Sequence, residues 1–267
     1  MIDADTVWLS PPAHIALAEQ DVHVWRAPLE QPASLIAHLQ RFLHTDEVAR
    51  AERFYFVRDR NHFIVARGLL RLLLGRYLDC APETVSFCYN EYGKPALDYQ
   101  PCRLHFNLSH SHDLVVYAFS LSRSLGIDIE YMRAEIAYEE LAKHYFSPVE
   151  YATLQALPAA SKGEAFYHCW TRKEAYIKAR GKGLSLPLDV FDVSLQPGAP
   201  AALLESREDP REPGRWKLQA LAPGAGYAGA LAAEGQDWQY RCWQLSLQDK
   251  WSCCPSVSVE KREGGGV

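Results

Sequence analysis

Two acidic residues near the middle of the chain stand in a pattern that suits cation binding. Asp128 and Glu130 occupy alternate positions, and isoleucines fill the positions before and between them. In a β-strand successive side chains point to opposite faces, so both acids would share one face while Ile127 and Ile129 enter a core. Two carboxylates roughly 6 Å apart repel by about 3 kcal/mol at an effective dielectric near 20, and a bound cation would reverse that effect. A strand with one solvated face explains the same pattern without a ligand.

A second pair of charged residues stands further along the chain, at Glu174 and Lys178. Residues four positions apart are neighbours on one face of a helix. An exposed pair of this kind adds only about 0.3–0.5 kcal/mol, so the pair alone does not indicate a site. Together with Asp128 and Glu130, however, Glu174 completes an all-oxygen ligand set that suits Mg²⁺. No histidine or cysteine joins the three acids, which argues against zinc or copper. The sequence therefore predicts a magnesium site with a phosphate-binding lysine one helical turn away.

These residues need a strand and a helix to position them. We expect the strand over 126–131 and a long helix over 162–180. The helix should open with a capping box of Ser161 and Glu164 and close at the glycines that follow Arg180.

The rest of the chain shows runs of helices and runs of strands. Further strands are expected over 21–25, 83–89, 104–108, 114–121, 191–195, 216–221, 227–232 and 240–245, and further helices over 33–43, 47–56 (capped by Asp46), 61–78, 136–145 and 148–156, with a loop over 196–214. Because helices and strands do not alternate strictly, the α+β class is favoured over a doubly wound α/β fold.

The composition bounds the class of protein. With 267 residues the chain has room for one large domain or two of roughly 100–150 residues. Its formal net charge of −5 excludes a global basic field for nucleic acid. The segment from Arg50 to Arg76 nevertheless carries seven arginines and only two acids, Glu52 and Asp59. Such a run is either a solvated helix surface or a local anion site, because arginine matches the geometry of phosphate.

The cysteines and the apolar runs bear on the compartment. Seven cysteines occur without any C-x-x-C pair, so we interpret them as reduced thiols rather than as zinc ligands or a disulfide framework. The first ten residues lack the apolar core of a signal peptide, and no uncharged apolar run approaches the ~18 residues of a membrane helix. We therefore expect a cytoplasmic protein that binds neither membranes nor nucleic acid.

Several sequence blocks together are more specific than either charged pair. In chain order these blocks are Gly93–Pro95, Phe106–Ser111, Gly126–Glu130, Phe146–Tyr151 and Phe166–Pro187. The third block, G-I-D-I-E, and the W-x-x-K-E-A-x-x-K-x-x-G-x-G pattern about forty residues later resemble the signature pair of the surfactin-synthetase-type 4′-phosphopantetheinyl transferases. The resemblance covers roughly residues 50–195 and is weak on either side.

The resemblance implies a fold. The family fold is α+β, a pseudo-dimer of two similar halves in one chain, with coenzyme A bound between them. On this chain it implies an N-terminal half over residues 1–124, on the nucleotide side of coenzyme A, and a C-terminal half over residues 125–250, with the magnesium site and the catalytic helix. We expect residues 251–267 to be a disordered tail. Because one chain supplies both sides of the cleft, we expect a monomer.

The resemblance also implies roles for individual residues. Mg²⁺ would be bound by Asp128, Glu130 and Glu174, and it would hold the pyrophosphate of coenzyme A. The coenzyme A contacts would be Arg53, Arg58, Lys94, Ser109, His110 and Lys178, with Asp128 and Glu174 acting through the metal. Lys178 would also take part in catalysis.

The base that activates the attacking serine is implied at Glu150, with Lys178 or a metal-bound water as alternatives. Simpler explanations exist for several of these residues. Glu150 also completes a capping box that begins at Ser147, Lys94 can be an ordinary turn lysine, and His110 can satisfy a strand end.

The implied reaction transfers 4′-phosphopantetheine from coenzyme A to a serine of an acyl or peptidyl carrier protein, with Mg²⁺, and releases adenosine 3′,5′-bisphosphate. Two alternatives use the same residues: a magnesium-dependent hydrolase of coenzyme A or a nucleotide, and a non-catalytic module that binds carrier proteins. Fatty-acid, polyketide and nonribosomal-peptide carriers all remain open. A hydrophobic docking groove for the carrier is expected near residues 115–119.

Overall fold

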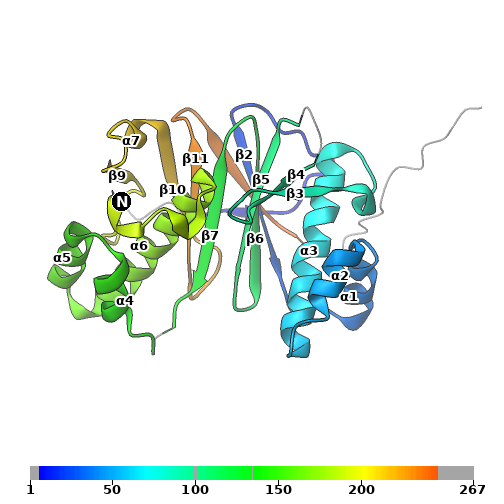
Figure 1. The fold of residues 1–267 in the computed structure, drawn as a ribbon, viewed down its shortest axis with the longest axis horizontal. Helices are drawn as coiled ribbons and strands as arrows, with labels where there is room; N and C mark the ends of the chain where they lie inside the picture. Colours follow the sequence, from blue (N-terminus) through cyan, green and yellow to red (C-terminus); the bar gives the residue numbers. More distant parts are fainter. Residues whose placement is uncertain (1–5, 99–101, 134, 246–267) are drawn as a thin grey trace, which may run out of the picture.

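The computed structural model describes residues 6–98, 102–133 and 135–245. The tail at 251–267, for which the sequence predicts disorder, lies outside these ranges. Within them, helices lie on both outer sides of the molecule and strands lie between them (Figure 1). None of the helices in the described ranges has the length and apolar character needed to cross a membrane.

The first half of the chain has a long strand, which is followed by a run of helices and then by a run of strands. Its elements are β2 (Asp21–Pro28), α1 (Ala33–Gln40), α2 (Thr45–Ala51), α3 (Val57–Leu78), the 3₁₀ turn η1 (Pro82–Thr84), β3 (Phe87–Tyr89), β4 (Pro95–Leu97), β5 (Leu104–Ser111) and β6 (Leu114–Leu121). The long helix α3 has 22 residues, and it buries apolar side chains such as Leu69 and Leu73 in the core of this half.

The second half repeats this order. Its elements are β7 (Leu125–Tyr131), α4 (Tyr138–Tyr145), α5 (Pro148–Ala156), α6 (Ala159–Arg180), the 3₁₀ turns η2 (Gly183–Ser185) and η3 (Leu188–Val190), β8 (Phe191–Val193), β9 (Leu203–Ser206), α7 (Glu212–Arg215), β10 (Trp216–Leu221) and β11 (Tyr227–Glu234). The long helix α6 also has 22 residues.

The strand topology of the two halves is the same. In the first half the strands pair in the order β2-β6-β5, and in the second in the order β7-β11-β10, all antiparallel. Each half also has a two-stranded sheet, β3-β4 and β8-β9. The prediction of an α+β pseudo-dimer of two similar halves is therefore confirmed.

Two further strands extend the first sheet. The strand β12 (Gln239–Gln244) follows the second half in the sequence, yet it pairs in parallel with β2, and the short β1 (Trp8–Leu9) pairs in parallel with β12. The last described strand of the chain thus belongs to the sheet of the first half, and it ties the two halves together.

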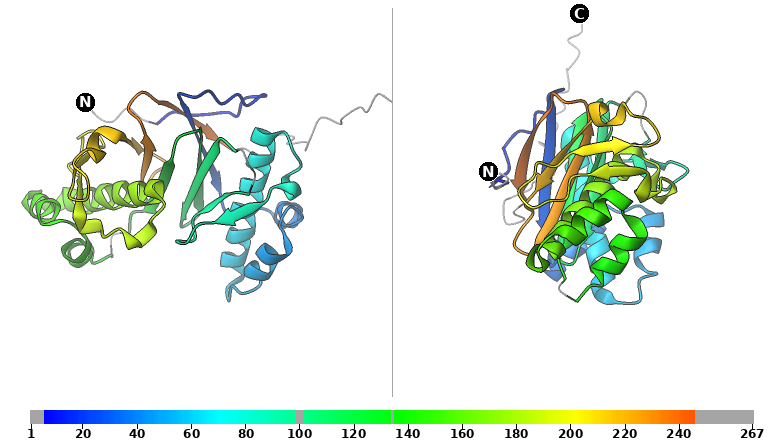
Figure 2. Two further views of the ribbon diagram at one scale, coloured as in Figure 1. Left: turned by 45° about the horizontal axis from the view of Figure 1, so that its top comes forward. Right: turned by 90° about the vertical axis from the view of Figure 1, so that its left-hand side faces the viewer.

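The two main sheets face each other across a shared apolar core. Val22 of β2, Val116 of β6, and Ile127 and Ile129 of β7 are fully buried there. The helices α3 and α6 each cover the outer face of their own sheet (Figure 2). The predicted alternation along β7 is thus confirmed, because the isoleucines enter the core between the sheets while the acid between them, Asp128, contacts α6.

A buried ion pair fixes the helices of the first half. Glu47 of α2 accepts a hydrogen bond from the backbone nitrogen of His44 (2.9 Å) and pairs with Arg71 of α3 (2.7 Å). Arg71 also donates to the carbonyl oxygens of Pro82 (3.2 Å) and Val85 (2.7 Å). Because an unpaired buried charge is strongly destabilising, this network holds α2, α3 and the turn after α3 in one arrangement.

Four helices start elsewhere than the sequence predicts. Helix α3 begins at Val57 and α4 at Tyr138, instead of at residues 61 and 136, and α2 and α6 have other N-caps. The N-cap of α2 is His44 rather than Asp46, because the carboxylate that closes its capping box comes three residues after His44. The N-cap of α6 is Pro158, so Ser161 and Glu164 lie inside the helix and form no capping box. Two alanines follow Pro158 and extend the helix toward its N-terminus, since alanine is the strongest helix former and proline fixes a suitable starting φ.

Several strand and loop predictions also differ from the structure. Strand β5 continues through 109–111, beyond its predicted end at Leu108. The predicted strand over 83–89 opens with a 3₁₀ turn, and the predicted loop over 196–214 contains β9 and the start of α7. The prediction of a docking groove near 115–119 is wrong. These residues belong to β6, an inner strand between β2 and β5, and all five are fully buried.

A buried histidine lies on β2, facing α3. The indole nitrogen of Trp25 donates to the hydroxyl of Tyr77 (2.9 Å), so the hydroxyl hydrogen can point to Nδ1 of His23 (2.8 Å). The other ring nitrogen of His23 is buried and has no hydrogen-bond partner among the described residues. Burial lowers the pKa of His23 to about 4, although Asp21 opposes this effect. Protonation at Nδ1 would also break the bond from Tyr77.

The low pKa of His23 predicts that this group costs the protein stability in mild acid. The unfolded chain takes up this proton near pH 6.5 and the folded chain only near pH 4, so the contribution of His23 to stability falls as the pH falls between these values. From pH 7 to pH 5 we expect this contribution to the free energy of unfolding to fall by about 2 kcal/mol. Because Glu174, whose pKa burial raises to about 7, acts in the opposite direction, the loss is measured by urea titration as the difference in pH dependence between the unmodified protein and His23→Gln. His14→Gln, at an exposed position, should keep the pH dependence of the unmodified protein. Equal pH dependence of all three proteins would contradict the assignment.

Candidate active site

Close packing of β7 against α6 brings acidic and basic side chains together. At Gly126 of β7, a Cβ atom would lie 2.2 Å from the carbonyl oxygen of Ala175 and 2.4 Å from the backbone nitrogen of Ala179, both in α6. Only glycine therefore permits this approach. As a result, Nζ of Lys178 lies 2.6 Å from Oδ1 of Asp128.

The predicted acids and Lys178 form one cluster at this packing. Trp170, Glu174 and Lys178 make a partly exposed stripe along α6, and the residues between them are buried. Burial, together with the charges of Asp128 and Glu130, raises the pKa of Glu174 to about 7, while Lys178 opposes the shift. Burial also raises the pKa of Glu130. We refer to Asp128, Glu130, Glu174 and Lys178 as the acid–lysine cluster.

The acid–lysine cluster has features that a divalent cation would stabilise. Oδ1 of Asp128 accepts hydrogen bonds from Lys178 (2.6 Å) and from Ser109 (2.8 Å), but its Oδ2 is buried and has no partner among the described residues. A buried carboxylate oxygen without a partner is costly, and burial together with the neighbouring like charges disfavours the ionised forms of the other two acids. All three groups offer oxygen ligands, which Mg²⁺ prefers. The residues present therefore fit a magnesium ion.

A second group of metal-ligand side chains lies on the first half. In the described ranges, ligand atoms of Glu30, His62 and Asp113 lie within 4.8 Å of one another. The carboxylate oxygens of Asp128, Glu130 and Glu174 do not meet this distance. The guanidinium of Arg58 contacts Glu30 (3.4 Å) and also Asp113. Since Arg58 already balances these acids and would repel a metal ion, we interpret this group as an ion-pair network. Arg58, predicted to contact the nucleotide, is thus held by two carboxylates.

Two other predicted contacts, Ser109 and His110, are consecutive residues of β5. Ser109 is 3.2 Å from Nζ of Lys178 in addition to its bond to Asp128. His110 points to the opposite face of the strand, and burial and then the charge of Lys178 lower its pKa. Of the two residues, Ser109 is the one that contacts the acid–lysine cluster.

Lys94 and Arg53 lie in different settings. Lys94, in the turn between β3 and β4, donates to the carbonyl oxygens of Lys178 (2.6 Å) and Leu125 (3.0 Å), and burial lowers its pKa to about 8. It therefore attaches the first half to the end of α6 and the start of β7. Arg53 instead lines a separate open hollow of about 610 Å³ with Arg50, at the end of α2.

The arginine-rich segment is mixed in character. Arg71 and Arg67 form buried ion pairs with Glu47, and Arg67 also donates to the hydroxyl of Tyr89 (2.8 Å). These two arginines are part of the core of the first half. The alternatives of a solvated surface or an anion site therefore apply only to the exposed members of the run.

Sequence reasoning missed two residues that contact β7. Asn107 and Ser111, which flank Ser109 at alternate positions on β5, both hydrogen bond to β7. The signal was a polar residue at every second position from Asn107 to Ser111, which is the pattern of one strand face. The predicted strand ended at Leu108, so only Asn107 of this pattern was placed on it.

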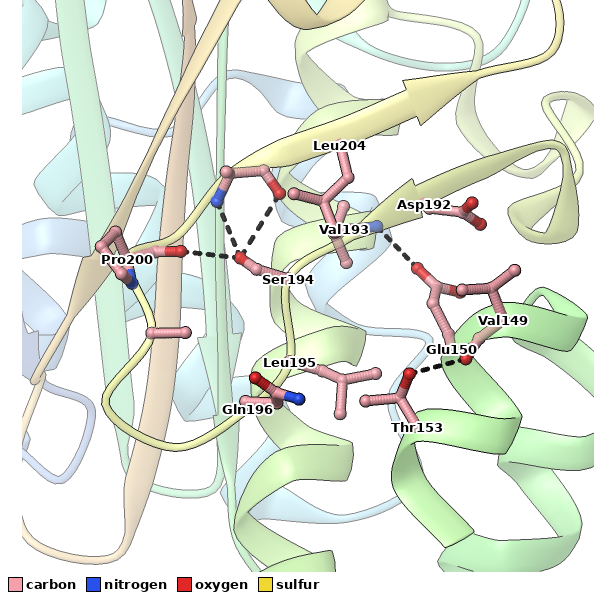
Figure 3. A pocket seen from close by; sticks show the side chains of 12 residues that line it. Val149, Glu150, Thr153, Asp192, Val193, Ser194, Leu195, Gln196, Pro200 and Leu204 are labelled. Carbon is pink, nitrogen blue, oxygen red and sulfur yellow. Dashed lines mark hydrogen bonds between the residues drawn. The ribbon is translucent and has the colours of Figure 1, made fainter. Parts of the chain in front are cut away.

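Glu150, the predicted base, is bound within the fold of the second half. Its Oε2 pairs with Nζ of Lys173 (2.7 Å) and accepts from the backbone nitrogen of Ser147 (2.9 Å). Its Oε1 accepts from the backbone nitrogen of Val193 (2.7 Å), a bond drawn in Figure 3 beside a groove between α5 and the β8–β9 sheet. The side chain is only 2 % exposed. The capping box predicted from Ser147 is present, and none of these partners belongs to the acid–lysine cluster.

Glu150 is the structural counterpart of Glu47 in the first half. Each completes the capping box of a short helix, and each pairs with a buried cation from the following 22-residue helix. Those cations, Arg71 and Lys173, each donate to two backbone carbonyl oxygens in the segment after the long helix. The buried pair occurs in both halves, whereas the acid–lysine cluster occurs only in the second half, on β7 and α6. A feature that both halves share points to a role in holding the helices.

Comparison with known proteins agrees with this geometry. A family model described as the 4′-phosphopantetheinyl transferase superfamily matches residues 124–232, and one described as 4′-phosphopantetheinyl transferase, N-terminal, matches residues 25–122. The chain is 41 % identical over 238 residues to 4′-phosphopantetheinyl transferase HetI from Nostoc sp. The aligned region covers 88 % of this chain and 97 % of that protein. It is 34 % identical over 208 residues to 4′-phosphopantetheinyl transferase Sfp from Bacillus subtilis, covering 78 % and 89 %.

The chain is a transferase with a duplicated α+β fold. It belongs to the 4′-phosphopantetheinyl transferase superfamily. The resemblance carried by the five sequence blocks is therefore confirmed.

The geometry of Glu150 predicts that Glu150→Gln destabilises the protein rather than slowing its chemistry. The change leaves the buried Lys173 ammonium without a counter-charge, which should lower the free energy of unfolding by about 3–5 kcal/mol in urea titrations. Glu150→Gln/Lys173→Met should recover much of that loss, because it removes both charges. The turnover of the double variant should stay within about threefold of the unmodified protein. A hundredfold loss of turnover with unchanged stability would instead make Glu150 the base.

Proposed function

We propose that this protein transfers the 4′-phosphopantetheine group of coenzyme A to a serine of an acyl or peptidyl carrier protein, with Mg²⁺, and releases adenosine 3′,5′-bisphosphate. The observation that carries the proposal is the acid–lysine cluster at the packing of β7 against α6, in a chain of this family. Three carboxylates beside one ammonium group suit a magnesium ion that shares a phosphate with a lysine.

The acids and the lysine of the acid–lysine cluster would have different roles. Asp128, Glu130 and Glu174 would hold Mg²⁺, which when bound neutralises charge on the pyrophosphate of coenzyme A. Lys178 contributes three N–H donors on a flexible stem, so its ammonium group can turn from Asp128 to a phosphate oxygen. A cation placed before the reaction stabilises the charge that develops during phosphoryl transfer.

The nucleotide end of coenzyme A would lie against the first half. Ser109 presents a polar group beside the cluster and His110 one on the opposite face of β5, and Lys94 uses two of its three donors on carbonyl oxygens, which leaves one N–H for a phosphate. Arg58 would exchange a carboxylate for a phosphate oxygen, and Arg53 would extend the positive surface further along the chain. The monomer remains our proposal for the assembly, because one chain supplies both β5 and β7.

We assign Glu150 a structural role, because both of its oxygens are used within the fold. Among the candidates of this chain for activating the serine, Lys178 is the one that lies at the acid–lysine cluster. The hydrolase alternative uses the same cluster, but it requires no carrier protein. The non-catalytic module requires a carrier but no turnover of coenzyme A. These differences define the first test.

Incubation with coenzyme A, Mg²⁺ and an apo carrier protein should raise the mass of the carrier by one phosphopantetheine group. Mass spectrometry of fatty-acid, polyketide and peptide carriers under the same conditions will also show which class is preferred. Without a carrier, coenzyme A should remain intact, whereas a hydrolase would consume it. A chelator should stop the transfer and added Mg²⁺ should restore it. Failure to modify any of the three carrier classes would refute the proposal.

Substitutions in the acid–lysine cluster should remove most of the transfer. Asp128→Asn and Glu174→Gln each remove a charged ligand, and we expect kcat/KM to fall by about 10²-fold or more in Mg²⁺ titrations. Lys178→Met should lower kcat by about 10²–10³-fold, as expected for the loss of a donor to transition-state charge. Glu164→Gln, at an exposed position on the same helix, is the matched control and should behave as the unmodified protein. A near-normal rate for Asp128→Asn would remove Asp128 from the site.

A further inference from the structure

Strands β5 and β7 meet through side chains rather than through a shared sheet. Each is the edge strand of its own sheet, β5 in the first half and β7 in the second. Three alternate residues of β5 bond to β7: Asn107 accepts from the backbone nitrogen of Ile127 (2.8 Å), Ser109 donates to Asp128 (2.8 Å) and Ser111 donates to Glu130 (2.7 Å). We call this set of contacts the β5–β7 seam.

The hydroxyl of Ser111 is oriented by two partners. Its oxygen accepts a hydrogen bond from the backbone nitrogen of Tyr131 (3.0 Å), and it lies 2.7 Å from Oε2 of Glu130. Since the backbone group can only donate, the single hydroxyl hydrogen is directed to the carboxylate. One oxygen of Glu130 is thereby fixed, and the orientation of the other follows from the planar carboxylate.

Glu130 needs such an anchor more than Asp128 does. Asp128 is buried and is held by both Lys178 and Ser109, whereas Glu130 is partly exposed at the end of β7. Its neighbours in the acid–lysine cluster include two like charges, which favour rotation of its carboxylate toward solvent. The hydrogen bond from Ser111 opposes that rotation.

We propose that Ser111 is a positioning residue for the magnesium site, which holds Glu130 in place for the cation and so sets the affinity of the site for Mg²⁺. This inference rests on the proposed function. Partners that orient a metal-binding carboxylate commonly change metal affinity by 10- to 100-fold when they are removed. Because Ser111 belongs to the first half and Glu130 to the second, the affinity of the site depends on how the two halves meet at the β5–β7 seam.

The test is a titration of the purified protein with Mn²⁺ alone, in which the electron paramagnetic resonance signal of free Mn²⁺ reports binding. Ser111→Ala should weaken Mn²⁺ binding by about tenfold or more. Ser111→Thr keeps the hydroxyl and should bind within about threefold of the unmodified protein. The matched control is Ser120→Ala. Ser120 also has a buried hydroxyl, on neighbouring β6, but it donates to the carbonyl oxygen of Arg123 and contacts no clustered acid. This variant should bind Mn²⁺ normally.

Transfer kinetics supply a second reading. In Ser111→Ala the Mg²⁺ concentration for half-maximal rate should rise by about tenfold, and saturating Mg²⁺ should restore most of kcat. If Ser111→Ala fails to fold, Ser111→Cys, a weak donor of similar size, replaces it and should bind Mn²⁺ more weakly than Ser111→Thr.

Two negative results separate the inference from the proposed function. Normal Mn²⁺ binding by Ser111→Ala, in a protein whose unmodified form binds Mn²⁺ and modifies carriers, would overturn the positioning role alone. Absence of Mn²⁺ binding and of carrier modification in the unmodified protein would overturn both.

Discussion

The site depends on one electrostatic constraint, which is that Asp128 and Glu130 must stay side by side on β7 although they repel each other. Their partners come from both halves. The first half supplies the hydroxyl groups of Ser109 and Ser111, and α6 supplies the ammonium group of Lys178. The acid–lysine cluster is therefore a product of the packing between the two halves and of the contact at Gly126, where only glycine lets α6 come close to β7.

A second constraint keeps that packing in register. In each half a glutamate from a short helix and a cation from the long helix are buried together, and the cation also binds the carbonyl oxygens of the next segment. Such pairs add little net stability compared with apolar residues, but losing one partner is costly, so they specify one arrangement of the helices. In the second half this arrangement sets the rotation of α6, because Lys173 precedes Glu174 directly. The buried pair thus helps to hold the helix that carries Glu174 without contacting the acid–lysine cluster.

Local patterns predicted much of this structure. The alternation around Asp128 and the spacing of Glu174 and Lys178 each require only the geometry of one element, and the structure brings these residues together. Contacts with distant partners lie beyond such patterns. The sequence shows Glu150 in a capping box, but it cannot show that a lysine of α6 occupies the remaining side of the carboxylate.

The same limit explains the errors in the strands. Residues 115–119 are an apolar run, which suits a docking surface as well as a core strand, and only the pairing of β2 and β5 on both sides of it decides for the core. The place of Ser111 in β5 follows from its pairing with Leu114 of β6, and its contacts with β7 lie across the boundary of the two halves. Residues at such a boundary are the hardest to predict, because neither half determines their partners by itself.

The duplication also shows how one half acquires chemistry. The inward valines of β2 correspond to the isoleucines of β7, since both sets enter the core between the sheets. The alternate positions that face the long helix are His23 and Trp25 on β2, and Asp128 and Glu130 on β7. In the first half these positions close a network with Tyr77 near the end of α3. In the second half they carry acids, and Lys178 stands near the end of α6. Each arrangement leaves one buried polar atom without a partner among the described residues, Nε2 of His23 in the first half and Oδ2 of Asp128 in the second, but only the second half places carboxylates at these positions. The same backbone position is thus part of an aromatic core in one half and of the acid–lysine cluster in the other.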